Sequence, residues 1–161
     1  MKLLVTGGLG FIGSNFIKHI VVNKEIEIIN VDAEFFGSSR SNLSEIENLD
    51  NYEFVKGNIT NRKLMEKLIS KSDVIINFAA QSHVDRSISD AKPFLVSNIR
   101  GVFTILDILK DQKKKMIQIS TDEVYGTILE GSAREKDRFN PSSPYSATKA
   151  SAELLINSYV I

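Results

Sequence analysis

The chain has 161 residues, of which 20 are basic and 20 acidic, so its formal net charge is zero. A neutral chain with 25% charged residues lacks the electrostatic footprint of a nucleic-acid-binding protein. With no cysteine and only two histidines, it offers no disulfide or thiolate–zinc site, and we expect no metal site. Its apolar runs are shorter than the roughly 20 residues of a membrane helix, and the N-terminus lacks signal-peptide features. Composition therefore predicts a soluble, cytoplasmic globular domain without a nucleic-acid or membrane partner.

Short apolar runs alternate with longer helical stretches along the chain. Near-continuous apolar runs of four to six residues are typical of strands covered on both faces. These runs predict strands at Lys2–Thr6, Glu27–Val31, Tyr52–Lys56, Asp73–Phe78 and Lys115–Ser120. The other stretches predict helices at Phe11–Val22, Leu43–Leu49, Arg62–Ser70, Lys92–Leu109 and Pro144–Tyr159. Alternation of this kind predicts an α/β fold with a doubly wound parallel sheet.

A glycine-rich turn follows the first predicted strand and opens the first predicted helix. Its sequence, Thr6-Gly7-Gly8-Leu9-Gly10-Phe11-Ile12-Gly13, contains both G-x-G-x-x-G and G-x-x-G-x-x-G. Glycine is needed there for the tight turn, for close approach to a pyrophosphate and for packing of helix on strand. The helix N-terminus adds unpaired N–H groups and a positive dipole end. We therefore predict a dinucleotide site whose first contacts are Gly7, Gly10, Phe11, Ile12 and Gly13.

Three later strand ends supply the other expected cofactor contacts. Asp32 lies 19 positions beyond Gly13, where a carboxylate accepts hydrogen bonds from the adenosine ribose hydroxyls and repels a 2′-phosphate. This spacing favours NAD over NADP. Asn58 and Ile59 follow the third strand, at the place of an adenine-edge contact. Ala79 and Ala80 follow the fourth strand, where small residues let the cofactor pass close to the backbone.

A tyrosine and a lysine share one face of the last predicted helix. Tyr145 and Lys149 are four residues apart, and a lysine ammonium beside a phenol favours the phenolate and lowers its pKa. Such a tyrosine can accept a proton from a substrate hydroxyl while hydride is removed. Thr121 follows the fifth strand at the same carboxyl edge of the sheet, where ligands bind. Together these residues predict an alcohol-oxidising site.

Three further stretches resemble a known family. They are Ala79–Ile88 (AAQSHVDRSI), Ile119–Gly126 (ISTDEVYG) and Pro141–Ala150 (PSSPYSATKA). With the glycine turn and the Tyr-x-x-x-Lys spacing, they resemble the short-chain dehydrogenase/reductase superfamily in its extended nucleotide-sugar branch, and within it the dTDP-glucose 4,6-dehydratases. The resemblance runs from Lys2 to the last residue. It implies a Rossmann-type NAD-binding domain over residues 1–161 that carries the catalytic residues.

The resemblance also implies a reaction. In that family NAD oxidises C4 of dTDP-glucose, water is lost across C5 and C6, and hydride returns to C6. Asp122 corresponds to the acid that protonates the departing C6 hydroxyl, and Glu123 to the base that removes the C5 proton. Two neighbouring carboxyl groups, one protonated and one ionised, suit that division of labour. The implied catalytic set is Thr121, Asp122, Glu123, Tyr145 and Lys149.

Several expectations surround this set. Ser82 is placed to line the nicotinamide or substrate pocket, and Thr121 to contact the substrate. The helix pair of the family implies a homodimer. Asn58 departs from the aspartate that is common in the family, which weakens the adenine assignment. The chain is about half as long as family members and ends after the Tyr145 helix, so we expect a fragment that lacks the C-terminal substrate lobe.

Other readings stay open from the sequence alone. Epimerases of the branch typically have small or hydroxyl residues in place of Asp122-Glu123, so this pair favours a dehydratase. The nucleotide base, dTDP or UDP, is not fixed, and a UDP-sugar epimerase, decarboxylase or dehydratase is the alternative enzyme. A non-catalytic NAD-binding module is the alternative from another class.

Four polar features are expected to have structural roles. We interpret His83 as a hydrogen-bonded loop residue, and Asp85 with Arg86 as an ion pair or loop anchor. Asn98 is expected to hydrogen-bond to backbone or cofactor-side groups. The run Lys113–Lys115 is read as the solvated end of a helix.

Overall fold

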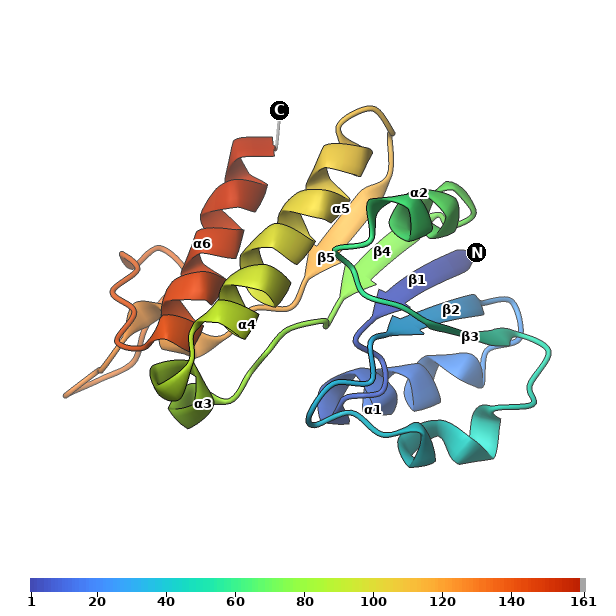
Figure 1. Cartoon of the computed structure of the whole chain (residues 1–161), viewed down its shortest axis with the longest axis horizontal. Helices are drawn as coiled ribbons and strands as arrows, with labels where there is room; N and C mark the ends of the chain where they lie inside the picture. Colours follow the sequence, from blue (N-terminus) through green and yellow to red (C-terminus); the bar gives the residue numbers. More distant parts are fainter. Residues whose placement is uncertain (160–161) are drawn as a thin grey trace.

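A five-stranded parallel sheet forms the centre of the computed structural model, which describes residues 1–159. The strands are β1 (Lys2–Thr6), β2 (Glu27–Asp32), β3 (Tyr52–Lys56), β4 (Val74–Asn77) and β5 (Lys115–Gln118). Their order in the sheet is β3-β2-β1-β4-β5, as Figure 1 shows. The order reverses between β1 and β4, which is the switch point where doubly wound sheets bind ligands. The predicted fold class is confirmed.

Alternate residues of the inner strands point into two separate apolar layers. Leu3 and Val5 of β1 pack on the face covered by α1 (Phe11–Val21), together with Ile17. Leu4 packs on the opposite face, under α2 (Arg62–Ser70) and α5 (Val102–Leu109). Because both faces are covered, the inner strands are continuously apolar, as expected for a parallel sheet.

The two edge strands differ from the prediction that every strand is covered on both faces. Ile117 of β5 is 50% exposed and Lys115 is exposed. In β3, Glu53 and Lys56 are exposed as well. An edge strand has only one neighbour, so less of the protein covers its faces.

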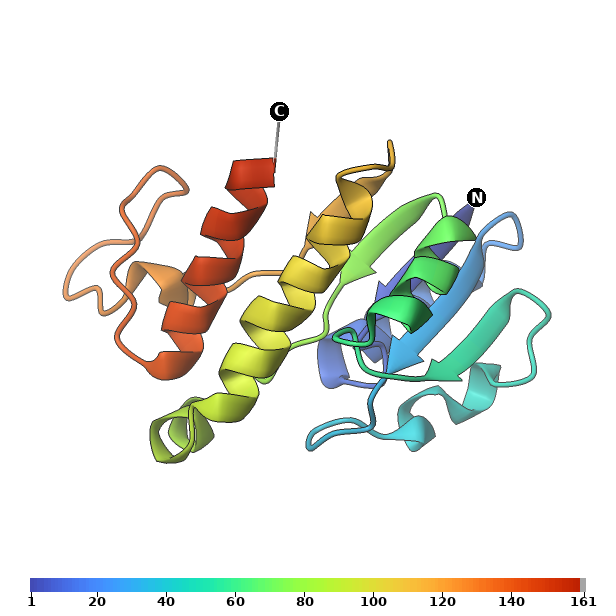
Figure 2. The ribbon, with the colours of Figure 1, turned by 45° about the horizontal axis from the view of Figure 1, so that its top comes forward.

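The remaining helices pack mainly on one another. They are α3 (Val84–Ser89), α4 (Lys92–Phe94), the π-helical segment η2 (Leu95–Gly101) and α6 (Pro144–Tyr159). Helix α3 contacts α4 and α6, and η2 contacts α4, α5 and α6. The predicted helix at Lys92–Leu109 is one continuous helical run made of α4, η2 and α5. Figure 2 shows this run lying beside α6, and Val102, Leu106 and Ala152 form the apolar contact between them. The sequence reading missed α3 altogether.

Two local predictions were wrong. The expected helix at Leu43–Leu49 is instead the 3₁₀ segment η1 (Arg40–Ile46), with a break at Leu43 where φ is −126°. Serine and asparagine side chains compete for backbone hydrogen bonds there, and the buried Leu43 and Ile46 are three residues apart, which suits a 3₁₀ turn.

The lysine run before β5 is also not simply solvated. The Lys114 ammonium donates hydrogen bonds to the carbonyls of Ile69, Ser70 and Ser72, the last at 2.7 Å. These carbonyls lie at the C-terminal end of α2, where a cation also offsets the helix dipole. Lys113 and Lys115 are exposed as expected.

Candidate active site

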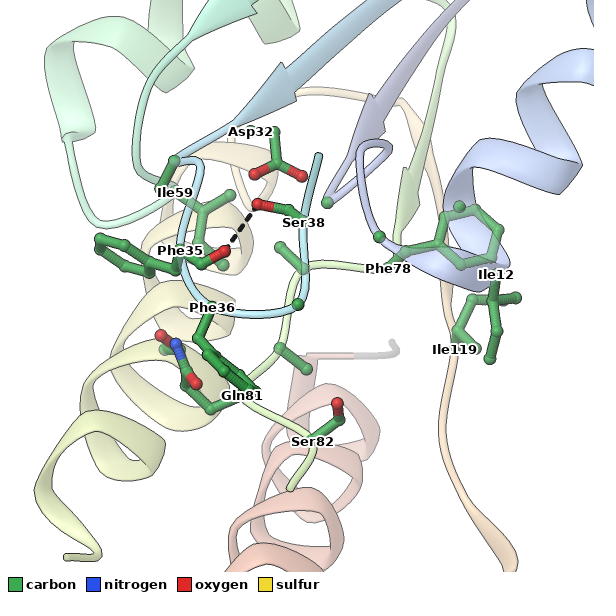
Figure 3. A pocket seen from close by; sticks show the side chains of 18 of the residues that line it. Ile12, Asp32, Phe35, Phe36, Ser38, Ile59, Phe78, Gln81, Ser82 and Ile119 are labelled. Carbon is green, nitrogen blue, oxygen red and sulfur yellow. Dashed lines mark hydrogen bonds between the residues drawn. The ribbon is translucent and has the colours of Figure 1, made fainter. Parts of the chain in front are cut away.

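A cavity of about 340 Å³ lies at the carboxyl ends of the strands, at the switch point of the sheet. Figure 3 shows Asp32, Phe36 and Ser82 around it. Every residue predicted to contact the cofactor lines this cavity: Gly7, Gly10, Phe11, Ile12, Gly13, Asp32, Asn58, Ile59, Ala79, Ala80, Ser82, Tyr145 and Lys149. The fold therefore brings together residues that span most of the sequence. Their role in binding stays a prediction.

The glycines of the turn are required for two different reasons. Gly7 has φ +70°, and a Cβ there would lie 2.5 Å from the Ala79 backbone nitrogen. A Cβ on Gly13 would lie 2.6 Å from the Gly7 carbonyl oxygen, so these two positions are fixed by packing within the chain. Gly10 is different, because its nearest such neighbour lies at 3.4 Å and the residue faces the cavity. The absence of a side chain at Gly10 leaves room for a ligand instead.

The N-terminus of α1 opens toward the same cavity. No side chain caps this helix, and its first residues, Phe11 and Ile12, are exposed. Uncapped N–H groups at a helix N-terminus, with the positive end of the dipole, form a ready site for a phosphate. The geometry of the turn thus fits the pyrophosphate of a dinucleotide.

Asp32 ends β2 as a nearly buried carboxylate, 7% exposed. One oxygen accepts a hydrogen bond from the Leu9 N–H at 3.0 Å, and the other accepts one from the Glu34 N–H at 2.8 Å. Each carboxylate oxygen can accept a further bond. The backbone contacts fix the carboxylate at the cavity wall, where it can receive two ribose hydroxyls.

Arg40 is held away from the cavity. Its guanidinium forms an ion pair with Glu34 and stacks on the Phe54 ring at 4.5 Å from the ring centre. The hydrogen bond from Arg40, followed by that from Lys56, lowers the pKa of Glu34 to about 2. Arg40 is therefore engaged elsewhere and is not among the cavity-lining residues.

The loop after Asp32 forms a wall that the sequence reading missed. Phe35, Phe36, Gly37 and Ser38 line the cavity, with Ser38 Oγ donating to the Phe35 carbonyl at 2.8 Å (Figure 3). The Arg86 guanidinium lies 4.1 Å from the centre of the Phe36 ring. Two adjacent aromatic residues in a loop directly after the strand-ending aspartate were the available signal.

The residues before and within α3 contact this loop. The His83 ring lies edge-on to Phe36, with ring centres 6.0 Å apart. Arg86 stacks on Phe36 and makes no ion pair with Asp85 among the residues that the structure describes. Arg86 is thus a loop anchor through cation–π contact, not through the pair with Asp85.

Asn58 and Ile59 reach the cavity from the end of β3. The Asn58 Oδ1 accepts hydrogen bonds from the Thr60 N–H and the Thr60 hydroxyl, both at 2.9 Å. This local turn leaves the amide nitrogen of Asn58 for a ligand. Ile59 packs against Gly101, where a Cβ would lie 2.4 Å from the isoleucine side chain.

The start of α6 carries Tyr145, which two serines position. The Ser143 hydroxyl accepts a hydrogen bond from the Ser146 N–H at 3.1 Å, and the Ser146 hydroxyl accepts one from the Ser143 N–H at 3.0 Å. Ser87 of α3, fully buried, accepts the Tyr145 N–H at 3.0 Å. The Phe94 ring packs edge-on against the Tyr145 ring. The first turn of α6 is therefore fixed both from within and by α3.

Burial raises the pKa of Tyr145, while a hydrogen bond with the Thr121 side chain opposes that rise. Burial lowers the pKa of Lys149 to about 8. The Lys149 ammonium, 5% exposed, donates to the Ile119 carbonyl at 2.6 Å. The lysine-driven lowering of the phenol pKa expected from the spacing is therefore not seen here, because the ammonium is directed to Ile119.

Thr121, Asp122 and Glu123 lie next to the cavity but do not line it. Thr121 caps the 3₁₀ segment η3 (Asp122–Tyr125) by accepting the Glu123 N–H at 3.3 Å. Asp122 is exposed and Glu123 is half-buried. Ile119 and Ser120, just before them, do line the cavity, although neither is among the predicted site residues. The two carboxylates thus stand at its rim.

Asn98 joins three parts of the site. Its side chain, 1% exposed, accepts the Gln81 N–H at 2.8 Å and donates to the Gln81 carbonyl and to Thr148 Oγ1, both at 2.9 Å. The expected bonding to backbone groups is present. Asn98 thereby ties η2 to the loop after β4 and to α6.

Two kinds of feature are absent from the described part of the chain. No helix within residues 1–159 is long and apolar enough to cross a membrane. Nor does this part contain a group of three or more histidine, cysteine or acidic side chains that could hold a metal ion.

Comparisons with known proteins agree with this geometry. The GDP-mannose 4,6 dehydratase family model matches residues 4–160. The low-salt glycan biosynthesis protein Agl12 of Haloferax volcanii is 48% identical over 160 residues, which are 99% of this chain and 52% of that protein. A dTDP-glucose 4,6-dehydratase of Mycobacterium tuberculosis is 43% identical over 164 residues, covering 99% of this chain and 49% of its own.

A solved structure gives the same picture. The dTDP-glucose 4,6-dehydratase DesIV of Streptomyces venezuelae, crystallised with NAD and TYD, superposes with a TM-score of 0.95 at 38% identity. The match covers 99% of this chain and 51% of that one. The chain therefore spans about half the length of the relatives it matches. The match over nearly every residue shows that the chain belongs to the GDP-mannose 4,6 dehydratase family.

Proposed function

We propose that this chain is the NAD-binding and catalytic half of a dTDP-glucose 4,6-dehydratase. One observation carries the proposal. The fold brings Tyr145 and Lys149 to the wall of the same cavity as the glycine turn and Asp32, with Asp122-Glu123 at its rim. The similarity to dTDP-glucose dehydratases along the whole chain supports this reading.

The residues present fit NAD. The uncapped N-terminus of α1 and the open space at Gly10 suit a pyrophosphate, and the Asp32 carboxylate suits the two ribose hydroxyls. The Asp32 carboxylate would repel a 2′-phosphate, and Arg40 would not offset this repulsion because it is paired with Glu34. NAD is therefore preferred to NADP. When bound, NAD supplies the hydride acceptor for the first step and the hydride donor for the last.

Tyr145 is the proposed base of the oxidation step. Its phenolate, formed when the phenol gives up its own proton, takes the proton of the C4 hydroxyl, and the Thr121 side chain opposes the rise in phenol pKa that burial causes. Lys149 lies one turn further along α6. When its ammonium moves from the Ile119 carbonyl toward Tyr145, it stabilises the negative charge of the phenolate. Ser82, in the cavity wall, is the proposed sugar contact together with Thr121.

Asp122 and Glu123 are proposed to carry out the elimination. The C4 ketone makes the C5 proton acidic, so Glu123 removes that proton while Asp122 protonates the departing C6 hydroxyl. Both carboxyl groups belong to η3, so one short stretch of backbone brings them together at the cavity rim. Hydride is then returned to C6 and Glu123 returns the proton to C5, so the net change is the loss of one water and the cofactor ends in its starting state.

The mass of the product tests this function. We would incubate dTDP-glucose with NAD and this chain, beside the longest protein encoded by its gene, and measure loss of one water by mass spectrometry. Loss of water with the longer protein supports the proposal. If neither form dehydrates dTDP-glucose while UDP-sugars are epimerised or decarboxylated, the reading of Asp122-Glu123 is wrong.

The substitution Glu123→Gln separates the two half-reactions. We expect the variant to oxidise C4, seen as near-ultraviolet absorbance of the reduced cofactor, yet to release no water. The matched control is Glu130→Gln, in the exposed segment after η3, which should behave as the unchanged protein. Loss of both oxidation and water release would show that Glu123 has another role.

We infer that the protein is a homodimer. A shallow groove between the η2–α5 run and α6 is lined by the apolar side chains of Leu95, Ile99, Phe103 and Leu155, together with Arg100, and Leu95 and Phe103 are 51% and 44% exposed. A second copy would cover such an apolar face. Sedimentation of Phe103→Glu beside the unchanged protein tests this: the charge should give monomers, and an unchanged mass would contradict the inference.

A further inference from the structure

A side-chain hydrogen bond outside the proposed catalytic set joins the segment after β5 to α6. The Ser120 hydroxyl donates to Oε1 of Glu153. Ser120 lies in the cavity wall between Ile119 and the Thr121 turn, and Glu153 lies one helical turn beyond Lys149. The bond therefore connects the segment that carries the carboxylates to the helix that carries Tyr145 and Lys149.

Lys149 depends on that same junction. Its ammonium is 5% exposed and donates to the carbonyl of Ile119, the residue directly before Ser120. Within residues 1–159 it makes no ion pair closer than 4.0 Å. A buried cation without a direct partner is costly, so a carboxylate nearby matters.

Glu153 is the acidic side chain that acts on this ammonium. Burial lowers the pKa of Lys149, and the charge of Glu153 opposes that effect. The other groups around the site are Tyr145 on α6, and Asp122 and Glu123 on η3, whose charges act on the Tyr145 phenol. The hydrogen bond from Ser120 restrains the position of the Glu153 carboxylate.

We propose that Glu153 is a positioning residue for Lys149. Through Ser120 it holds the segment after β5, and with it the Ile119 carbonyl, against α6, and its carboxylate supplies negative charge one helical turn from the buried ammonium. The catalytic roles of Lys149 and Tyr145 in this proposal rest on the proposed function. The geometry of the junction stands without it.

Two substitutions separate the charge from the hydrogen bond. Glu153→Gln removes the charge but keeps an oxygen that accepts from Ser120. Ser120→Ala keeps the charge but removes the donor, which frees the Glu153 side chain to move. The matched controls are Glu66→Gln, an exposed carboxylate on α2, and Ser151→Ala, whose hydroxyl donates only to the Ala147 carbonyl within α6.

The titration of Lys149 is the direct measurement. We would follow the side-chain carbon and nitrogen resonances of the lysines by NMR against pH, and assign Lys149 with the variant Lys149→Arg. The Lys149 midpoint should move downward in Glu153→Gln, and downward by less in Ser120→Ala. Both controls should leave it unchanged, and the backbone amide spectra should show that all variants are folded.

Each other outcome is decisive. An unchanged midpoint in Glu153→Gln would overturn the proposal, because the charge would then have no effect on the ammonium. A shift in Glu153→Gln but none in Ser120→Ala would overturn positioning through Ser120. The measurement uses neither cofactor nor sugar nucleotide, so it succeeds or fails independently of the dehydratase proposal.

Discussion

The two sides of the cavity are built in different ways. On the β1–α1–β2 side, the glycine turn and Asp32 lie within one short stretch of sequence, and backbone groups fix each of them. On the β5–α6 side, Tyr145, Lys149 and the carboxylates come from separate segments. Side chains far apart in sequence hold them, among them Ser87, Asn98 and Ser120. The cofactor side is thus a local structure, whereas the catalytic side depends on tertiary contacts.

A substitution in the glycine turn should have the largest effect. Gly7→Ala places a Cβ 2.5 Å from the Ala79 nitrogen in a backbone with φ +70°, so we expect a loss of about 3 kcal/mol or more in unfolding free energy. NAD binding should disappear with it. Gly37→Ala is the matched control, since φ is +89° but the space is open, and should lose about 1 kcal/mol. Urea unfolding measures both, and equal losses would show that backbone strain alone matters.

On the catalytic side, Lys149→Met should change how stability depends on pH. The folded pKa of Lys149, about 8, lies below the usual 10.5, so the unfolded chain binds more protons between these values. The free energy of unfolding of the unchanged protein should therefore rise with pH from about 8 to 10.5 relative to the variant. The difference between the folded and unfolded pKa values of Lys149 corresponds to roughly 3 kcal/mol. Near neutral pH, the variant should be more stable than the unchanged protein by about that amount.

The control for that experiment is Lys67→Met on the exposed side of α2, which removes a charge without burying one. It should show the same pH dependence as the unchanged protein. Parallel curves for the unchanged protein and Lys149→Met, from urea unfolding at several pH values, would mean that Lys149 titrates normally in the folded state.

A third substitution tests cofactor choice on the local side. Asp32→Ala removes the carboxylate proposed to bind the ribose, and we expect NAD affinity to fall about tenfold to a hundredfold, as for loss of charged hydrogen bonds. The affinity for NADP should fall less, because the repulsion of a 2′-phosphate is also lost. Calorimetric titration with both cofactors measures this ratio. An unchanged ratio would contradict the proposed role of Asp32.

The smallest effect is expected at a tertiary contact of the catalytic side. Ser87→Ala leaves the Tyr145 N–H without its acceptor, which should cost about 1–2 kcal/mol of unfolding free energy. Ser151→Ala, at a half-buried position of α6 whose hydroxyl bonds only within that helix, should cost less than about 0.5 kcal/mol. Thermal unfolding compares the two, and equal shifts would show that α3 does not hold the start of α6.

The features that the sequence could predict are mainly those of the cofactor side, whereas the tertiary contacts of the catalytic side were missed. The strands, α1, the glycine turn and Asp32 were predictable because their signals are local periodicity and spacing. Phe36 was missed because its partners, His83 and Arg86, are distant in sequence. Ser87 was missed because α3, with six residues, is too short to show a helical period. The direction of the Lys149 ammonium depends on burial and on the Ile119 carbonyl, which spacing does not reveal.

The π-helical segment η2 has a consequence for changes in chain length. Its wide turn contains Asn98, which bonds the loop after β4 and α6, and ends at Gly101, which packs closely against Ile59. Removing one residue there would restore regular helix but rotate Asn98 by about 100° away from both partners. Insertions and deletions in this run should therefore be tolerated far less than in the exposed segment between η3 and α6. A scan of single-residue deletions would show η2 as a part of the catalytic side whose length cannot vary.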